Sequence, residues 1–149
     1  MVDLTKPAST ALGQRTVDSI EILRSKVANK IFGQYCDRAV RTELIRQAIT
    51  DFGVEPMRAQ VLIDMELDSL GFVNEYALCN ELNGLLHRFT DGDMKLSNKE
   101  RQDAMQMVCK ARPGLSKGLA FDVAERLITE FCRAHNVKVK VGLFSWAIP

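Results

Sequence analysis

The sequence predicts an all-α protein: about six helices in one compact, bundle-like domain, with an extended C-terminal tail that could form a strand. Three observations carry this prediction. Apolar residues recur at intervals of three and four along most of the chain, as they do on one face of an amphipathic helix. Glycines and capping residues divide this pattern into segments of helical length. Only the last residues change to an alternating, strand-like pattern.

Three regions follow from these patterns. Residues 1–14 contain Pro7 and Gly13 and lack apolar periodicity, so we expect a flexible N-terminal tail. Residues 15–136 form the predicted helical domain, in which we find no convincing internal repeat. Residues 137–149 form the predicted extended apolar segment.

Four helices are expected in the first part of the helical domain. The first runs from Thr16 to near Gly33, and the second covers about 37–52, with Gly53 as its stop. The third begins with an acid and a proline in its first turn and ends before Gly71. Its apolar residues are Met57, Val61, Leu62 and Met65. The fourth has Asn74 as N-cap and reaches Phe89.

Two further helices are expected after residue 96. Ser97 and Glu100 have the spacing of a capping box, in which each side chain accepts a hydrogen bond from the other residue's backbone amide. The helix that they open stops at "ARPG". Ser116 is predicted to cap the sixth helix, which ends at His135 and Asn136.

The C-terminal segment "VKVKVGLFSW" alternates valine with lysine, which is typical of a strand. No second strand is evident in the sequence, so we expect either docking on the chain's own helices or antiparallel pairing with a second copy in a homodimer. In the paired arrangement the valines face the helices and the aromatic residues anchor the contact. The predicted interaction residues are Val137, Val139, Val141, Leu143, Phe144 and Trp146.

The stretch "FTDGDMKLSNKE" is the clearest candidate for a cation-binding loop. An EF-hand that began at Asp91 would have Asp93 at its third position, but Lys95 at the fifth and Gln102 at the twelfth. A lysine ammonium repels a cation, and glutamine cannot supply a bidentate carboxylate. The sequence therefore argues against an EF-hand and favours a capped turn between two helices.

The longer stretch Leu85–Arg101, "LLHRFTDGDMKLSNKER", resembles the loop of the tellurite-resistance TerB-like helical proteins. In that family, Asp-Gly loops and nearby acids are associated with divalent-cation binding and with stress-response or signalling roles. The resemblance implies a divalent-cation site at Asp91, Asp93 and Glu100; no other cofactor is expected.

Charge and cysteine content narrow the compartment and the kind of partner. The net charge of +1 attracts the chain neither to nucleic acid nor to membranes, although residues 51–94 carry −7. No apolar run is long enough to cross a bilayer, and the first residues do not form a signal peptide. The four cysteines are widely spaced, as expected for free thiols in a cytoplasmic protein.

Catalytic signatures are lacking. Cys132-x-x-His135 has metal-like spacing, but the other cysteines are not arranged in pairs that could complete a zinc site. The residues around "CKARPGLSKG" could form a helix-turn-helix, although acidic residues occupy the following helix. We expect a small non-catalytic interaction or regulatory module that contacts a protein partner or itself. The alternatives are a divalent-cation-responsive TerB-like domain and a nucleic-acid-binding helical protein.

Overall fold

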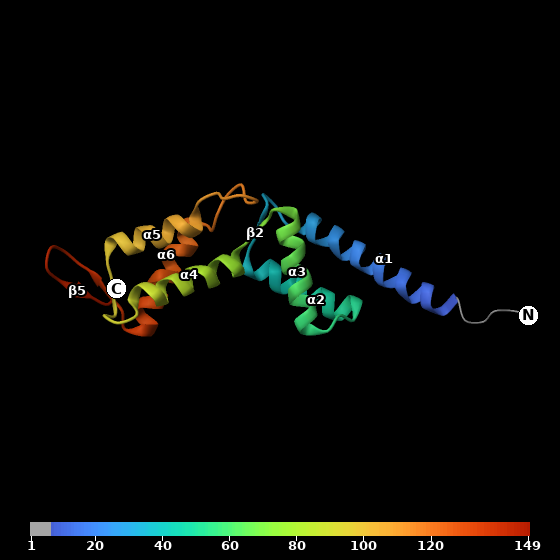
Figure 1. Ribbon diagram of the computed structural model, residues 1–149, viewed down its shortest axis with the longest axis horizontal. Coiled ribbons are helices and arrows are strands. Elements are labelled where there is room, and N and C mark those ends of the chain that lie inside the picture. The colour runs from blue at the N-terminus through green and yellow to red at the C-terminus, as the bar shows by residue number, and fades with distance from the viewer. Residues whose placement is uncertain (1–6) are drawn as a thin grey trace, which may run out of the picture.

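The computed structural model describes the backbone of residues 7–149 and the side chains from residue 18 onward. Over this range the protein is mostly helical, as predicted, with six helices and five short strands (Figure 1). The helices are α1 (Pro7–Lys30), α2 (Arg38–Phe52), α3 (Pro56–Leu70), α4 (Glu75–Thr90), α5 (Asn98–Cys109) and α6 (Phe121–His135). The strands are β1 (Tyr35–Cys36), β2 (Val73–Asn74), β3 (Lys95–Leu96), β4 (Lys138–Lys140) and β5 (Trp146–Ala147).

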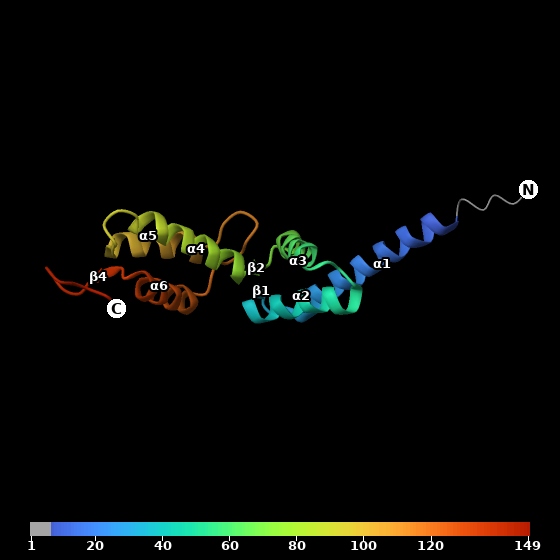
Figure 2. The same ribbon diagram turned by 90° about the horizontal axis from the view of Figure 1, so that it is seen from below.

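Helix α1 begins at Pro7, whereas the first helix was expected to begin at Thr16, after a flexible tail; residues 1–6 lie outside the described residues. Proline suits the first turn of a helix, and the alanine, leucine, glutamine and arginine that follow are good helix formers. Apolar periodicity is needed only where a helix packs. The first turns of α1 extend beyond α2 and α3 (Figures 1 and 2), so this signal was missing from the sequence.

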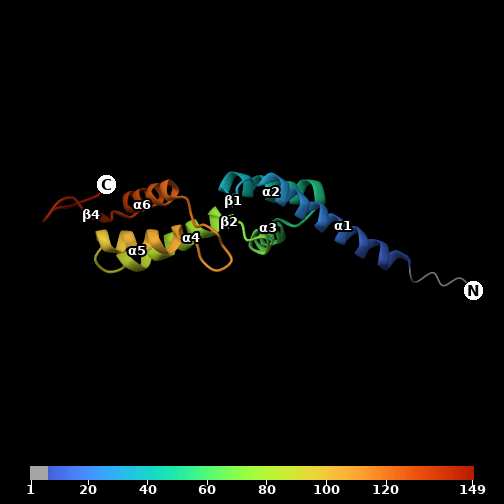
Figure 3. The same cartoon turned by 90° about the horizontal axis from the view of Figure 1, so that it is seen from above.

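The helices form two groups along the long axis of the molecule, α1–α3 and α4–α6 (Figures 2 and 3). Each group has its own core. The first core contains Leu23, Val27, Ile31, Cys36, Leu44, Ala48, Ala59, Ile63 and Leu67. The second core includes Leu82, Leu86, Leu96, Ala104, Val108, Ala124, Ile128, Cys132 and Val137, together with Val73 from β2.

The two groups repeat one order of elements: helix, strand, helix, helix, strand. We call residues 7–74 the first repeat and residues 75–140 the second repeat. The two strands of each repeat pair in parallel, β1 with β2 and β3 with β4. The turn before the first strand also matches, because Gln34 and Met94 both have positive φ, 59° and 54°.

Hydrogen bonds and buried positions support this correspondence. The Gln34 carbonyl accepts from the Val73 amide at 2.8 Å, and the Met94 carbonyl accepts from the Lys138 amide at 3.0 Å. The inner face of α3 is matched on α6, with each pair 65 positions apart in the sequence. The matched residues are Ala59, Ile63 and Leu67 on α3 and Ala124, Ile128 and Cys132 on α6, all at most 1% exposed.

The C-terminal strand finds its partners within the chain, so the prediction of a missing partner is wrong. Strand β4 lies between β3, to which it is parallel, and β5, to which it is antiparallel. Val137 is fully buried and Val139 packs against the second core, as expected for residues that face helices. Val141 is exposed instead, because the hairpin has left the helices at this point. Strands of two residues are too short to give an alternating pattern, which is why β3 was not predicted.

Most predicted helix ends are confirmed. Asn74 and Ser97 accept hydrogen bonds from the backbone of the helices that they begin, and Glu100 completes the capping box. Gly53, Gly71 and Asn136 end their helices in the left-handed conformation. Ser116 was wrongly predicted as a cap. Helix α6 begins at Phe121 without a side-chain cap, and the Ser116 hydroxyl instead donates to the Gln34 side chain.

Candidate functional site

The junction between the repeats is centred on the start of α4, where Glu75 is buried. The Tyr35 hydroxyl donates to Glu75 Oε2 at 2.6 Å and accepts from the Ala120 amide at 3.3 Å. Arg38 lies 3.5 Å from the other Glu75 oxygen. Burial, followed by the hydrogen bond to Glu75, raises the pKa of Tyr35, so the phenol stays protonated. These contacts join β1 of the first repeat to the start of α4 and to the N-cap residue of α6 in the second repeat.

A second polar cluster surrounds Arg41, which is 6% exposed. Its Nε and Nη2 donate to the two oxygens of Asp64, each at 2.7 Å. Asn74 Nδ2 donates to Asp64 Oδ1 at 2.8 Å, and the Arg41 guanidinium lies 3.9 Å from the centroid of the Tyr76 ring. The hydrogen bonds to Asp64 raise the pKa of Arg41. Both charges are thus paired, and they fix the angle between α2, α3 and the start of α4.

The loop of residues 110–120 spans the two repeats. Arg112 makes a bidentate pair with Glu81 on α4, at 3.0 and 2.9 Å. The same loop approaches the first repeat at Gly114. A Cβ atom on Gly71 of the first repeat would lie 3.0 Å from the Gly114 carbonyl oxygen. Residues 110–120 therefore form a bridge to the other repeat and not the short turn of a helix-turn-helix.

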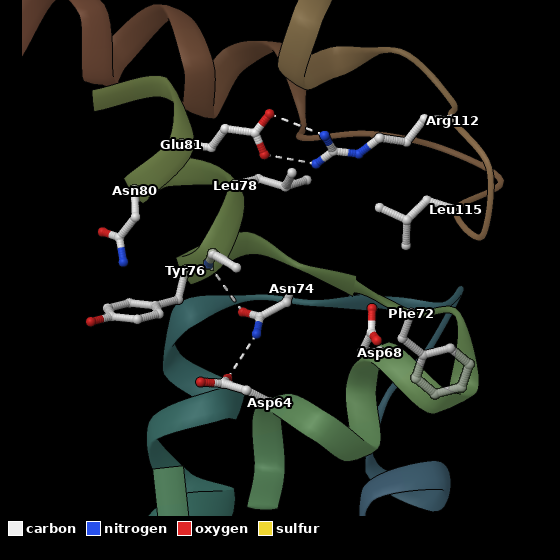
Figure 4. Close-up of a pocket in the computed structure, with 11 residues that line it drawn as sticks. Asp64, Asp68, Phe72, Asn74, Tyr76, Leu78, Asn80, Glu81, Arg112 and Leu115 are labelled. Atoms are coloured by element: carbon white, nitrogen blue, oxygen red, sulfur yellow. Dashed lines mark hydrogen bonds and ion pairs between the residues drawn. The ribbon is translucent and has the colours of Figure 1, made fainter. Parts of the chain in front are cut away.

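The polar clusters border a cavity of about 520 Å³ at the junction (Figure 4). Carboxylates from α3 and α4 face it from opposite sides, with Leu78 and Leu115 between them (Figure 4). Asp64 and Glu81 are each paired with an arginine, Arg41 and Arg112. The polar lining residues are Asp64, Asp68, Asn74, Tyr76, Asn80, Glu81 and Arg112.

The four thiols are free, and their surroundings disfavour nucleophilic chemistry. Burial raises the pKa of Cys36 to about 11, and burial is also the main cause of the raised pKa values of Cys79, Cys109 and Cys132. A thiol with a raised pKa stays protonated at neutral pH and is a poor nucleophile or metal ligand. The cysteines thus serve as small core residues.

Cys132 and His135, which have metal-like spacing, occupy different environments. Cys132 is fully buried in the second core. The ring of His135 packs against Phe131 and against His87 of α4, with ring centroids 4.5 and 4.9 Å apart. The histidines therefore form an aromatic cluster at the surface between α4 and α6.

The proposed cation ligands Asp91, Asp93 and Glu100 have other roles or lie apart. Asp93 Oδ1 accepts from the Lys95 amide at 3.0 Å, and Glu100 Oε2 accepts from the Ser97 amide at 2.8 Å. Asp91 is exposed at the end of α4. Within the described residues, no group of three or more histidine, cysteine or acidic side chains is arranged to hold a metal ion. The TerB-like resemblance stays a prediction.

The predicted interaction segment divides at Val141. Val137 and Val139 belong to the second core, whereas Leu143 and Phe144, at the tip of the hairpin between β4 and β5, are 81% and 93% exposed. Trp146 is half-buried, with Lys95 Nζ 5.2 Å from its ring centroid. The structure thus presents two large apolar side chains at one end of the molecule.

A second apolar surface was missed. On α3 the buried residues are Ala59, Ile63 and Leu67, whereas Met57, Val61 and Met65 are 75%, 56% and 64% exposed. We call these three residues the outer α3 face. The sequence shows apolar residues on both sides of this helix, and helical periodicity alone cannot tell which side is buried.

Comparison with protein-family models, with curated proteins and with solved structures found no match to this chain. No helix in the described part of the chain is long and apolar enough to cross a membrane.

Proposed function

We propose that the protein is a small, non-catalytic helical module of the cytoplasm that regulates or assembles other proteins by direct contact, including contact with a second copy. The observation that carries this proposal is the exposure of Leu143 and Phe144 at the hairpin tip. Large apolar side chains at one exposed point are a feature of interaction surfaces.

The hairpin is held in place, which favours binding. The Val141 amide donates to the Ser145 carbonyl at 2.8 Å, and Arg133 Nε donates to the Pro149 carbonyl at 2.7 Å. A preorganised contact loses little conformational entropy on binding. Within the described sheet, β5 is an outer strand, so its free edge could pair with the same edge of a second copy about a two-fold axis.

The non-catalytic part of the proposal rests on the chemistry of the junction. Its buried carboxylate, Glu75, is held by Tyr35 and Arg38, and Asp64 is held by Arg41. Charge-assisted hydrogen bonds of this kind hold the paired groups in a fixed geometry, which supports a structural role for the junction.

A photo-cross-linking amino acid at position 144 tests the proposal in cells of the source organism. We expect one discrete adduct, either with a partner protein or with a second copy. The matched control carries the cross-linker at Gln102, an exposed position on α5. Adducts no more abundant than those of the control would contradict the proposal.

Sedimentation velocity separates the two kinds of partner. A self-associating chain should sediment as a dimer, and the double variant Leu143→Ser, Phe144→Ser should sediment as a monomer of about 16.7 kDa. A monomeric wild-type protein with a foreign adduct at position 144 would assign the hairpin to another protein.

A further inference from the structure

We propose that the outer α3 face, Met57, Val61 and Met65, is a docking surface for an amphipathic helix of a partner protein whose apolar side is bordered by lysine and arginine. This inference rests on the proposed function, since it assumes that the protein works through protein contacts. It adds a second surface, at the other repeat, and the chemistry of its partner.

The comparison of the repeats shows that the fold does not need this apolar face. Helix α6 packs its inner residues as α3 does, yet its outer face is charged. The positions that correspond to the outer α3 face are Asp122, Arg126 and Glu130, all exposed. Since α6 has three charged residues at these positions, folding does not require apolar residues at the matched positions of α3. Contact with a partner supplies an explanation for them.

The shape of the surface suits a helix. Residues at intervals of four lie in one line along α3, so their side chains form a continuous apolar strip. Beside the strip, between α1 and α3, is a hollow of about 200 Å³ that could receive one large side chain of the partner. Methionine side chains are flexible and adapt to such a partner. The hollow is lined by Ile20, Leu23, Leu62 and Met65, and by the Arg24–Glu66 ion pair.

The charged residues around the outer α3 face indicate the charge expected on the partner helix. Among the described charged residues of α3 and its N-cap, Glu55, Asp68 and Arg58 have no ion-pair partner, whereas Asp64 pairs with Arg41 and Glu66 pairs with Arg24. Among the described residues the Asp68 side chain has no hydrogen-bond partner either. An acidic border attracts basic residues and repels both anionic lipid and the same border of a second copy. Basic residues on the partner helix are therefore expected on either side of its apolar face.

Methionine methyl NMR tests this inference on the full chain. The probe is a synthetic peptide of about 20 residues with leucine at helical spacing and lysine elsewhere, and the comparison peptide has glutamate in place of lysine. Met57 and Met65 report on the outer α3 face, while the exposed Met94 and Met107 are internal controls elsewhere on the surface.

We expect saturable shifts of the Met57 and Met65 signals with the lysine peptide, and binding weaker by about tenfold or more with the glutamate peptide. Val61→Asp should weaken lysine-peptide binding by a similar factor, whereas Arg126→Asp, at the matched position of α6, should not. Equal binding of both peptides, equal shifts at Met94 and Met107, or no shift at Met57 and Met65 would overturn the inference. So would co-flotation with anionic vesicles that depends on Val61.

The two proposals fail separately. If Met57 and Met65 do not respond while position 144 cross-links to a partner, the inference about α3 is wrong and the proposed function stands. If the Met57 and Met65 signals shift while position 144 yields no adduct, the hairpin does not contact a partner, and the inference that the outer α3 face binds a helix stands.

Discussion

Helices α3 and α6 share an inner face and differ on the outside. Ile63 and Ile128 occupy matched core positions, at 0% and 1% exposure, whereas Val61 and Arg126 occupy matched outer positions with opposite character. The helix–strand–helix–helix–strand arrangement sets which positions are buried. The outer positions are not buried, so their residues can differ between the two helices. We infer a binding function where they differ, at the outer α3 face.

The connections between the repeats' second and third helices also differ. In the first repeat the connection is residues 53–55, while in the second it is the loop of residues 110–120, which reaches the other repeat through Ser116 and Gly114. This loop and the Tyr35–Glu75 contact make the junction one unit. The four comparisons that follow test the correspondence, from the largest expected effect to the smallest.

The matched core substitutions Ile63→Ala and Ile128→Ala should each lower the free energy of unfolding by about 2–5 kcal/mol, because each leaves a cavity in a closed core. Urea denaturation measures both. Val61→Ala on the outer α3 face is the control and should change stability by about 0.5 kcal/mol or less. A small effect at only one isoleucine would mean that the two cores are not equivalent.

The matched arginines Arg41 and Arg101 should differ. Asp64→Ala leaves Arg41 buried without its bidentate partner, so we expect a loss of about 2–4 kcal/mol. Glu125→Ala removes a 3.6 Å pair with Arg101 whose side chains are 38% and 48% exposed, and should cost about 0.5 kcal/mol or less. Equal losses in thermal or urea unfolding would contradict the asymmetry.

Gly118 belongs only to the longer loop of the second repeat. A Cβ at this position would lie 2.4 Å from the Val108 carbonyl oxygen, so Gly118→Ala should destabilise the protein by about 1–3 kcal/mol. Gly84, inside α4, has nothing within 4 Å of such a Cβ, and Gly84→Ala should stabilise the helix by about 0.5–1 kcal/mol. Two shifts of the same sign in thermal unfolding would argue against the close approach.

The matched helix caps Asp37 and Ser97 should contribute similarly. Each accepts a hydrogen bond from a backbone amide in the first turn, from Val40 at 2.8 Å and from Glu100 at 3.2 Å. Replacement of either residue by alanine should lower the unfolding free energy by about 1 kcal/mol. An unchanged urea midpoint for one variant would mean that its helix begins elsewhere.

The sequence predicted the features that depend on neighbours in the chain. Capping residues, such as Ser97 with Glu100, and the glycine stops of α2 and α3 were recognisable because their chemistry is local. The repeat was not recognisable, because few matched positions hold the same residue and several matched core positions differ, such as Cys36 and Leu96. The pairing of β3 with β4 was also hidden, since it joins segments far apart in the chain.

The candidate surfaces were predicted in part. The C-terminal alternation indicated the strand β4, but the sequence did not show that β3 pairs with it. Because of this pairing, the most exposed part of the predicted interaction segment is the hairpin tip, Leu143 and Phe144. On α3 the sequence supplies two apolar sides, and only the packing against α1 and α2 shows that Val61 is outside and Ile63 inside. Burial of one side over the other is a tertiary property.

The most direct measurement transfers the outer residues of α6 onto α3. The triple variant Met57→Asp, Val61→Arg, Met65→Glu gives α3 the charged face of its counterpart. If the apolar face serves binding and not folding, the free energy of unfolding measured in urea should change by about 0.5 kcal/mol or less, as expected for surface changes, while the lysine peptide no longer binds. A variant that unfolds readily, or one that binds the peptide as the wild type does, would contradict the account.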